Sequence, residues 1–388
     1  MSANLPIYLD YNATTPVAPE VADAMLPFLR EHFGNPSSAH PYGRLAAQAV
    51  AEARHRVAAL IGARDDEIAF TGCATEANNL ALLGVARALG NTRRHLVVSA
   101  VEHPAVMAPA RQLEAQGWRL TVVPVDGCGR VSPDDVARAL QPDTALVSVM
   151  HANNEVGTLQ PVAEIAALTR ARNILLHTDA AQSAGKIAVN VDTLGVDLVT
   201  LAGHKFYATK GIGALYVRGG TPIRSVLYGA DQEHGLRPGT ENVPAIVGLG
   251  TAAKLARERL AETTAQLRAS RDQLHGQLLR AIPGLLLNGH PEQRLPNTLH
   301  VSFPAVSGRR LLAEVGDRVA ASVGSACHSE HDAVSGVLAA MGIDAARAAG
   351  AVRLSVGAMT TSDEVGRAAA SLIEAWQRLV GADQSRQP

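Results

Sequence analysis

The 388-residue chain has few aromatic residues and almost no net charge. Phe, Trp and Tyr make up 3% of the sequence, and 35 Lys and Arg residues are balanced by 36 Asp and Glu residues. A protein that binds nucleic acid needs a basic surface for the phosphates, and one that binds single strands also needs aromatic rings for the bases. The composition therefore predicts no nucleic-acid partner.

Long apolar runs and a basic leader are also missing. No stretch of about 18 apolar residues occurs, as a membrane-spanning helix would require. The first residues, MSANLPIYLDYNATTP, lack the basic and then apolar pattern of a signal peptide. Cysteine is scarce, since only Cys73, Cys128 and Cys327 occur, and this odd number favours reduced thiols over a disulfide framework. We therefore expect a cytoplasmic protein with no membrane association.

Short apolar segments alternate with helical segments over the first 245 residues. Apolar side chains at helical spacing predict helices at 43–61, 75–88 and 161–172. Strands are predicted at seven apolar, β-branched segments: 67–71, 95–100, 119–125, 145–150, 174–178, 196–201 and 213–218. This alternation predicts an α/β fold with a mostly parallel seven-stranded sheet.

The sequence changes in character after residue 245. A long helical stretch rich in Ala, Leu and Arg continues to residue 281, and a mixed α/β segment follows to residue 380. Since 388 residues exceed what one small core needs, two domains are expected. We predict a large domain at 15–255, and a smaller α/β domain made of 1–14 and 256–388.

Polar clusters directly follow four of the predicted strands. They are Thr75-Glu76, Glu102-His103, Asp179-Ala180-Ala181-Gln182 and His204-Lys205. Ligands of parallel sheets bind beyond the carboxyl ends of the strands, so these clusters should face one crevice.

Such a set of residues suits pyridoxal 5'-phosphate (PLP). That cofactor needs a lysine for a Schiff base, a carboxylate against its pyridine nitrogen and a helix N-terminus for its phosphate. Lys205, Asp179 and Ala74-Thr75 can supply these three groups. Alone, each residue has an ordinary explanation, because a lysine after a strand is usually solvated and Asp179 could cap a helix. His103 could likewise be a structural histidine, so the interpretation depends on the joint placement.

A series of short segments then identifies a family. In chain order they are YLDYNATTP (8–16), FGNPSSAH (33–40), TEANN (75–79), VEHPAV (101–106), ANNEVGT (152–158), HTDAAQ (177–182), GHKFY (203–207), RPGTEN (237–242), RLPNT (294–298), GSACHS (324–329) and RLSVG (353–357). Together they resemble the cysteine desulfurase and selenocysteine lyase family, PLP enzymes of the class V aminotransferase type with fold type I. The resemblance covers nearly the whole chain.

The resemblance implies roles around the cofactor ring. It implies that Lys205 carries PLP and moves the Cα proton of the substrate, and that Asp179 pairs with the pyridine nitrogen. Gln182 would hydrogen-bond the ring hydroxyl. His103 would stack over the ring and act as an acid–base group.

Further roles concern the phosphate and the substrate. The resemblance implies that Ala74, Thr75 and His204 bind the phosphate, and that Thr240 reaches the phosphate of the other subunit in a homodimer. Asn12, Asn154, Arg353 and His328 are the predicted substrate-binding residues. An arginine fork suits a carboxylate on physical grounds as well, which supports Arg353. Gly203 and the pair Gly72-Cys73 stand where many members have serine, so the phosphate hydroxyls differ here.

Cys327 is the predicted acceptor of sulfur or selenium. A thiolate is the reactive form, and His328 or His331 would favour it as a nearby cation. By spacing, these three residues could instead bind a metal, but no further ligand motif accompanies them, so we predict no metal.

The run Cys327-His328-Ser329-Glu330-His331 resembles the loop of selenocysteine lyases, whereas Pro104 resembles the desulfurases. We predict removal of selenium from L-selenocysteine, with L-alanine as the other product. The alternative is a cysteine desulfurase that converts L-cysteine to L-alanine and holds the sulfur as a Cys327 persulfide for transfer, with an acceptor protein as partner.

Two other interpretations stay open at this point. An aminotransferase would need Lys205 and Asp179 but not Cys327, and a non-enzymatic sulfur-carrier scaffold would bind no PLP. The match of Gly248-x-Gly250-x-x-Ala253 to a dinucleotide fingerprint follows no predicted strand, so we interpret it as chance.

Overall fold

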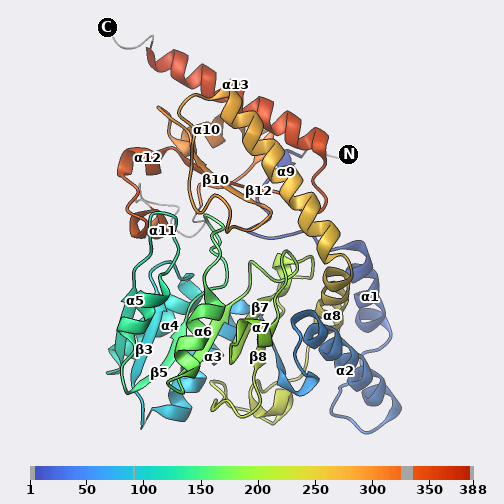
Figure 1. Cartoon of the computed structure of the whole chain (residues 1–388). Helices are drawn as coiled ribbons and strands as arrows, with labels where there is room; N and C mark the ends of the chain where they lie inside the picture. The colour runs from blue at the N-terminus through green and yellow to red at the C-terminus, as the bar shows by residue number, and fades with distance from the viewer. Residues whose placement is uncertain (1–4, 91, 325–334, 385–388) are drawn as a thin grey trace.

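The chain forms a large part around a seven-stranded sheet and a smaller part around a three-stranded sheet (Figure 1). The computed structural model describes residues 5–90, 92–324 and 335–384. The predicted α/β fold, with a mostly parallel seven-stranded sheet and a smaller α/β part, is confirmed.

The large sheet has the strand order β2-β8-β7-β6-β5-β3-β4. The strands are β2 (Ile68–Thr71), β3 (His95–Ser99), β4 (Arg119–Val123), β5 (Thr144–Ser148), β6 (Leu175–Asp179), β7 (Leu198–Ala202) and β8 (Gly213–Val217). The five strands from β7 to β4 pair in parallel, and β8 is antiparallel to both of its neighbours. All seven coincide with predicted segments, because strands covered on both faces have continuous apolar sequences.

Helices cover both faces of the large sheet. Their bounds are α1 (Pro19–Arg30), α2 (Pro41–Ile61), α3 (Ala74–Leu89), α4 (Pro104–Ala115), α5 (Pro133–Ala139), α6 (Val162–Arg170), α7 (Val191–Leu194) and α8 (Val243–Glu258). Two hydrophobic cores result, because successive strand residues point to opposite faces. Val97 of β3 is in one core, together with α2, α6 and α8, whereas Leu96 and Val98 are in the other with α3 and α4.

The smaller part has its own sheet and core. Its strands are β9 (Leu286–Leu287), β10 (Thr298–Ser302) and β12 (Ala351–Ser355), and its helices are α9 (Leu260–Ala281), α10 (Gly308–Val315), α11 (Gly336–Ala340), α12 (Ala345–Ala349) and α13 (Ser362–Gln384). The N-terminal strand β1 (Ile7–Tyr8) pairs with β11 (Val319–Ala320), and Leu9 is buried in the core of this part. Residues from both ends of the sequence therefore build it.

The predicted single helical stretch from 245 to 281 is two helices, α8 and α9. Arg259 separates them with a non-helical backbone (φ −106°, ψ 9°). α8 packs against α1 and α2, whereas α9 packs against α13 of the smaller part. The two glycines of the weak dinucleotide match lie inside α8, where Gly250 allows close approach to Ala53 of α2. In the part of the chain that the structure describes, no helix is long and apolar enough to span a membrane.

Candidate active site

A cavity of about 640 Å³ lies at the carboxyl ends of the parallel strands, where the two parts of the chain meet. The predicted residues that line it are Asn12, Ala74, Thr75, His103, Asn154, Asp179, Gln182, His204, Lys205 and Arg353. Thr240 does not line this cavity and is exposed. Cys327, His328 and His331 lie outside the described residues, so their roles stay predictions.

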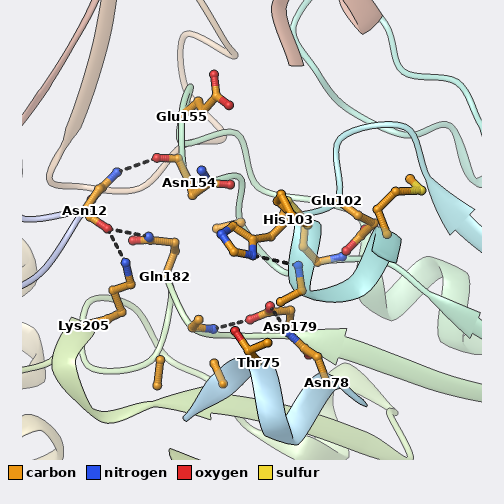
Figure 2. Close-up of a pocket in the computed structure, with 18 of the residues that line it drawn as sticks. Asn12, Thr75, Asn78, Glu102, His103, Asn154, Glu155, Asp179, Gln182 and Lys205 are labelled. Carbon is orange, nitrogen blue, oxygen red and sulfur yellow. Dashed lines mark hydrogen bonds between the residues drawn. The ribbon is translucent and has the colours of Figure 1, made fainter. Parts of the chain in front are cut away.

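Lys205 is held by backbone carbonyl groups from the N-terminal segment. It ends a short 3-10 turn, Gly203–Lys205, that directly follows β7. Its Nζ donates a hydrogen bond to the carbonyl oxygen of Asn12 at 2.7 Å (Figure 2) and another to that of Ala13 at 2.8 Å. The amine therefore lies in the cavity at a fixed position, as a covalent attachment point requires.

Asp179 ends β6, and both of its carboxylate oxygens are held by donors. Its Oδ2 accepts from the Asn78 amide at 2.7 Å (Figure 2), and its Oδ1 accepts from the backbone N–H of Ala181 at 2.8 Å. Asn78 lies on α3 and is fully buried. The sequence patterns assigned Asn78 no role. It lies one helical turn after Ala74 and therefore on the same face of α3, and this spacing could have indicated it.

His103 caps the start of α4 and lines the cavity. The backbone N–H of Ala105 donates to its Nδ1 at 3.1 Å, which leaves the proton of the neutral ring on Nε2. Burial lowers the pKa of His103, Asp179 acts in the opposite direction, and Lys205 adds to the lowering. The neutral ring therefore carries on Nε2 a proton that it can donate.

The N-terminus of α3 faces the cavity with Ala74 and Thr75. Its first N–H groups have no partner within the helix, and the helix dipole favours an anion there. His204 lies nearby, and its Nδ1 is 3.1 Å from the Thr14 hydroxyl. Burial, Lys205 and the other lysines near it lower the pKa of His204 to about 4, so it is neutral at physiological pH.

Arg353 of β12 brings a positive charge to the cavity from the smaller part. Its Nη2 donates to Asp10 Oδ1 at 2.7 Å, and its Nη1 donates to the carbonyl oxygens of Asn154 and Gly324. Its Nε is buried and has no partner among the described residues. Because Arg353 lines the cavity, its guanidinium charge suits a substrate carboxylate there.

Asn12 is more constrained than the sequence predicted. Its side-chain nitrogen donates to the Asn154 carbonyl (3.1 Å) and the Thr298 hydroxyl (2.9 Å), and its side-chain oxygen accepts from Asn297. Because these contacts occupy the amide, the clearest contribution of Asn12 to the site is its backbone carbonyl, which holds Lys205. Gln182 also donates to this carbonyl, at 2.9 Å.

Three further residues near the cavity were not assigned a role from the sequence. Glu102 precedes His103 and also lines the cavity; it accepts from Ser99 and from the backbone of Met150, and burial raises its pKa to about 8. Asp10 pairs with Arg353. Lys186 is buried against Gln182. Of these three residues, only Glu102 directly follows a predicted strand. The sequence therefore gave little indication of a role for Asp10 and Lys186.

The residues present fit PLP. The cavity offers a lysine amine, a carboxylate held by two donors and a helix N-terminus, which match the aldehyde, the pyridine nitrogen and the phosphate of that cofactor. When bound, PLP supplies an electron sink next to the Cα atom of an amino acid. Over the described residues, no group of three or more His, Cys, Asp and Glu side chains could hold a metal ion. Fold and site thus define a PLP-dependent enzyme of the aminotransferase type.

Comparisons with known proteins identify the family. Residues 7–367 match the aminotransferase class-V model. The chain is 45% identical over 360 residues to the cysteine desulfurase IscS of Dictyoglomus turgidum, which covers 92% of this chain and 91% of the relative. The chain therefore belongs to the aminotransferase class-V family.

Solved structures agree with this assignment. A NifS-like protein superposes with a TM-score of 0.90 at 38% identity, covering 97% of this chain and 100% of that chain. A structure described as SspA in complex with cysteine gives a TM-score of 0.81 at 35% identity, covering 91% and 99% of the two chains. Both likenesses cover the large and the small part together.

Proposed function

We propose that the protein is a cysteine desulfurase, which converts L-cysteine to L-alanine and takes up the sulfur on Cys327. The relative from Dictyoglomus turgidum is named a cysteine desulfurase, and the SspA structure contains cysteine. These names favour the desulfurase over the selenocysteine lyase that the Cys327-His328-Ser329-Glu330-His331 run suggested.

The observation that supports this function most directly is the placement of Lys205 and Arg353 in one cavity. Arg353 and Asn154 would hold the carboxylate of the amino acid, so that its Cα lies toward Lys205. Lys205 would then remove the Cα proton. His103 can serve as a second proton carrier, because burial keeps it neutral.

Cys327 would accept the sulfur without any external oxidant. The Cβ–S bond of the substrate breaks, an S–S bond to Cys327 forms, and the hydrogens of the thiols remain on alanine and on the persulfide. Gly324 and Gly336, which flank the segment that contains Cys327, both line the cavity. This placement supports a role for Cys327 at the same site.

The test is alanine production from L-cysteine by the purified holoenzyme, with L-selenocysteine in a parallel assay. Without a reducing thiol, we expect one burst of alanine, about one per subunit, because the Cys327 persulfide blocks a second turnover. With a reducing thiol, turnover should continue and release sulfide. A Cys327→Ser variant should lose the cysteine reaction while it keeps bound PLP.

Other outcomes would change the assignment. An amino-group transfer that a Cys327→Ser variant retains would indicate an aminotransferase. A rate with L-selenocysteine larger by orders of magnitude, which a His328→Thr variant loses, would indicate a selenocysteine lyase.

The assembly and the cellular setting belong to the same proposal. The exposed Thr240 would reach the phosphate site of a second copy in a homodimer, and the persulfide would pass to an acceptor protein in the cytoplasm. Mixing a Thr240→Val chain with a Lys205→Ala chain tests the first point. In the mixed dimer, the Thr240→Val chain supplies an intact Lys205 and the Lys205→Ala chain supplies an intact Thr240. If Thr240 acts across subunits, the site that combines these two residues should recover normal phosphate binding.

A further inference from the structure

Lys186 is a buried lysine whose ammonium group donates hydrogen bonds only to Gln182 among the residues that the structure describes. Its side chain is 5% exposed, and its Nζ donates to the backbone carbonyl and to the side-chain Oε1 of Gln182, both at 3.0 Å. No carboxylate pairs with it in the described part of the chain. Burial of a charged amine without a counter-ion is costly, so the contact with Gln182 needs an explanation.

The two ends of the Gln182 amide have the same shape but opposite hydrogen-bonding character. A lysine ammonium has three donors and no acceptor, so only the amide oxygen can face Lys186. The amide nitrogen must then point the other way, where it donates to the Asn12 carbonyl at 2.9 Å (Figure 2). Lys186 and the Asn12 carbonyl therefore fix the Gln182 amide from its two ends, and Lys186 is the side chain that holds its oxygen away from the cavity.

The backbone around Lys186 keeps this arrangement rigid. Gly185 has a positive φ of 75°, and a Cβ atom there would lie 2.8 Å from the side chain of Phe206. The Lys186 N–H donates to the carbonyl of Ser183 at 3.0 Å. The turn that joins Gln182 to Lys186 is thus closely packed beneath the cavity.

We propose that Lys186 is a positioning residue that holds the Gln182 amide nitrogen toward the cavity as a hydrogen-bond donor for the ring oxygen of PLP. The ionised ring oxygen of that cofactor only accepts hydrogen bonds, so a reversed amide would place two acceptors together. The inference rests on the cofactor and does not depend on the substrate proposed above.

Lys186 is also close enough to the other charged groups of the site to interact with them. Burial, together with the positive charges of Lys205 and Arg353, lowers the pKa of Lys186 to about 7. Lys205 and Gln182 also share one acceptor, the Asn12 carbonyl. The three side chains thus form one connected unit next to the point of cofactor attachment.

A purely structural role for Lys186 has to be separated from this one. The Thr264 hydroxyl of α9 donates to the Lys186 backbone carbonyl at 2.7 Å, so the residue also connects α9 to the turn. Thr264→Val removes that contact and leaves Nζ and Gln182 in place. It is the matched control for local loosening.

The experiment compares Lys186→Met, Gln182→Ala and the double variant. For each we would measure PLP affinity by reconstitution of the apoprotein, and the pH midpoint of the absorbance change of the bound cofactor. Each single variant should bind PLP on the order of tenfold more weakly and shift that midpoint, because both lose the same donor. The double variant should be no worse than Gln182→Ala, since Lys186 acts through Gln182. Thr264→Val should leave both readouts unchanged.

The proposal is overturned if Lys186→Met binds PLP like the wild type, or if the losses of the two single variants add up in the double variant. Should Lys186→Met fail to fold, Gln182→Glu supplies a second test that leaves Lys186 intact. This variant keeps an acceptor for Lys186 but has no N–H for the cofactor, so we expect the same loss of affinity as in Gln182→Ala. Unchanged affinity in Gln182→Glu would also overturn the proposal.

Discussion

Burial sets the charge of the ionisable residues beneath the cavity. Burial lowers the pKa of His151 to about 4 and that of His177 to about 3, so both are neutral and hydrogen-bond to serine hydroxyls. The carboxyl group of Glu102 is also buried, and its Oε2 has no partner among the described residues. Its pKa is raised to about 8 mainly by that burial, so Glu102 is protonated at neutral pH in the folded protein.

Glu102 should therefore make the stability depend on pH. In the unfolded chain its pKa is near the model value of 4.5, whereas in the folded chain it is about 8. Between these values unfolding releases a proton, so this contribution to stability is complete below pH 4.5 and is lost as the pH rises toward 8. The slope approaches about 1.4 kcal/mol per pH unit for one such group.

A Glu102→Gln variant should lack this contribution, because the amide keeps the shape without the titration. Urea unfolding of both proteins, measured at several pH values between about 5 and 8, gives the comparison. The difference in stability should shift in favour of the variant as the pH rises. Parallel pH curves for the two proteins would contradict the prediction.

At the scale of elements, the start of α3 depends on its closeness to β8. Gly213 begins β8, and a Cβ atom there would lie 2.7 Å from the backbone carbon of Cys73 and 3.0 Å from the nitrogen of Ala74. It would also lie 2.8 Å from the Leu201 carbonyl oxygen. These are backbone atoms that cannot rotate away, so only glycine allows the helix N-terminus to lie at this position beside the sheet.

Gly213→Ala should thus displace the start of α3. We expect a loss of about 1–3 kcal/mol in stability, as for other overpacked sites, and weaker binding of PLP through its phosphate. Thermal unfolding and PLP affinity measure the two effects. Gly366→Ala in α13 is the matched control, because no atom lies within 4 Å of its added Cβ, and it should be neutral or stabilise by up to about 1 kcal/mol.

At the scale of the whole molecule, the N-terminal segment connects the two parts. Leu9 is fully buried in the core of the smaller part, while Asn12 and Ala13, a few residues later, hold Lys205 in the large part. The backbone of Leu9 is fixed by Ala320 and Ser355. The position of the reactive amine therefore depends on the packing of the smaller part.

Leu9→Ala should weaken stability and cofactor binding together. A cavity at a fully buried leucine costs about 2–5 kcal/mol, and a looser segment would hold Lys205 less firmly. Leu372→Ala in α13 provides the comparison, because Leu372 is fully buried in the same core but lies on α13, outside the segment that holds Lys205. It should lose similar stability with unchanged PLP affinity. Equal losses of PLP affinity in the two variants would contradict the prediction, because they would show that the N-terminal segment does not transmit the packing of Leu9 to Lys205.

The sequence by itself determined the elements and the residues at strand ends. Strands covered on both faces are apolar along their whole length, so β2 to β8 could be located from apolar, β-branched segments of the sequence. Lys205, Asp179 and His103 follow strands, and the carboxyl ends of parallel strands necessarily meet at one edge of the sheet. The break at Arg259 was not predicted, because neither Gly nor Pro marks it in the sequence, and the two helices separate only where they pack against different parts of the chain.

Only the tertiary structure decided which side chains hold those residues in place. Asn78 meets Asp179 across 101 positions of sequence, Lys205 meets the Asn12 carbonyl across 193, and Arg353 meets Asp10 across 343. A hydrogen bond depends on distance and direction to within a fraction of an ångström, and the packing of helices, sheet and the smaller part sets both. Sequence patterns record which face of an element is apolar, but not which polar groups packing brings together.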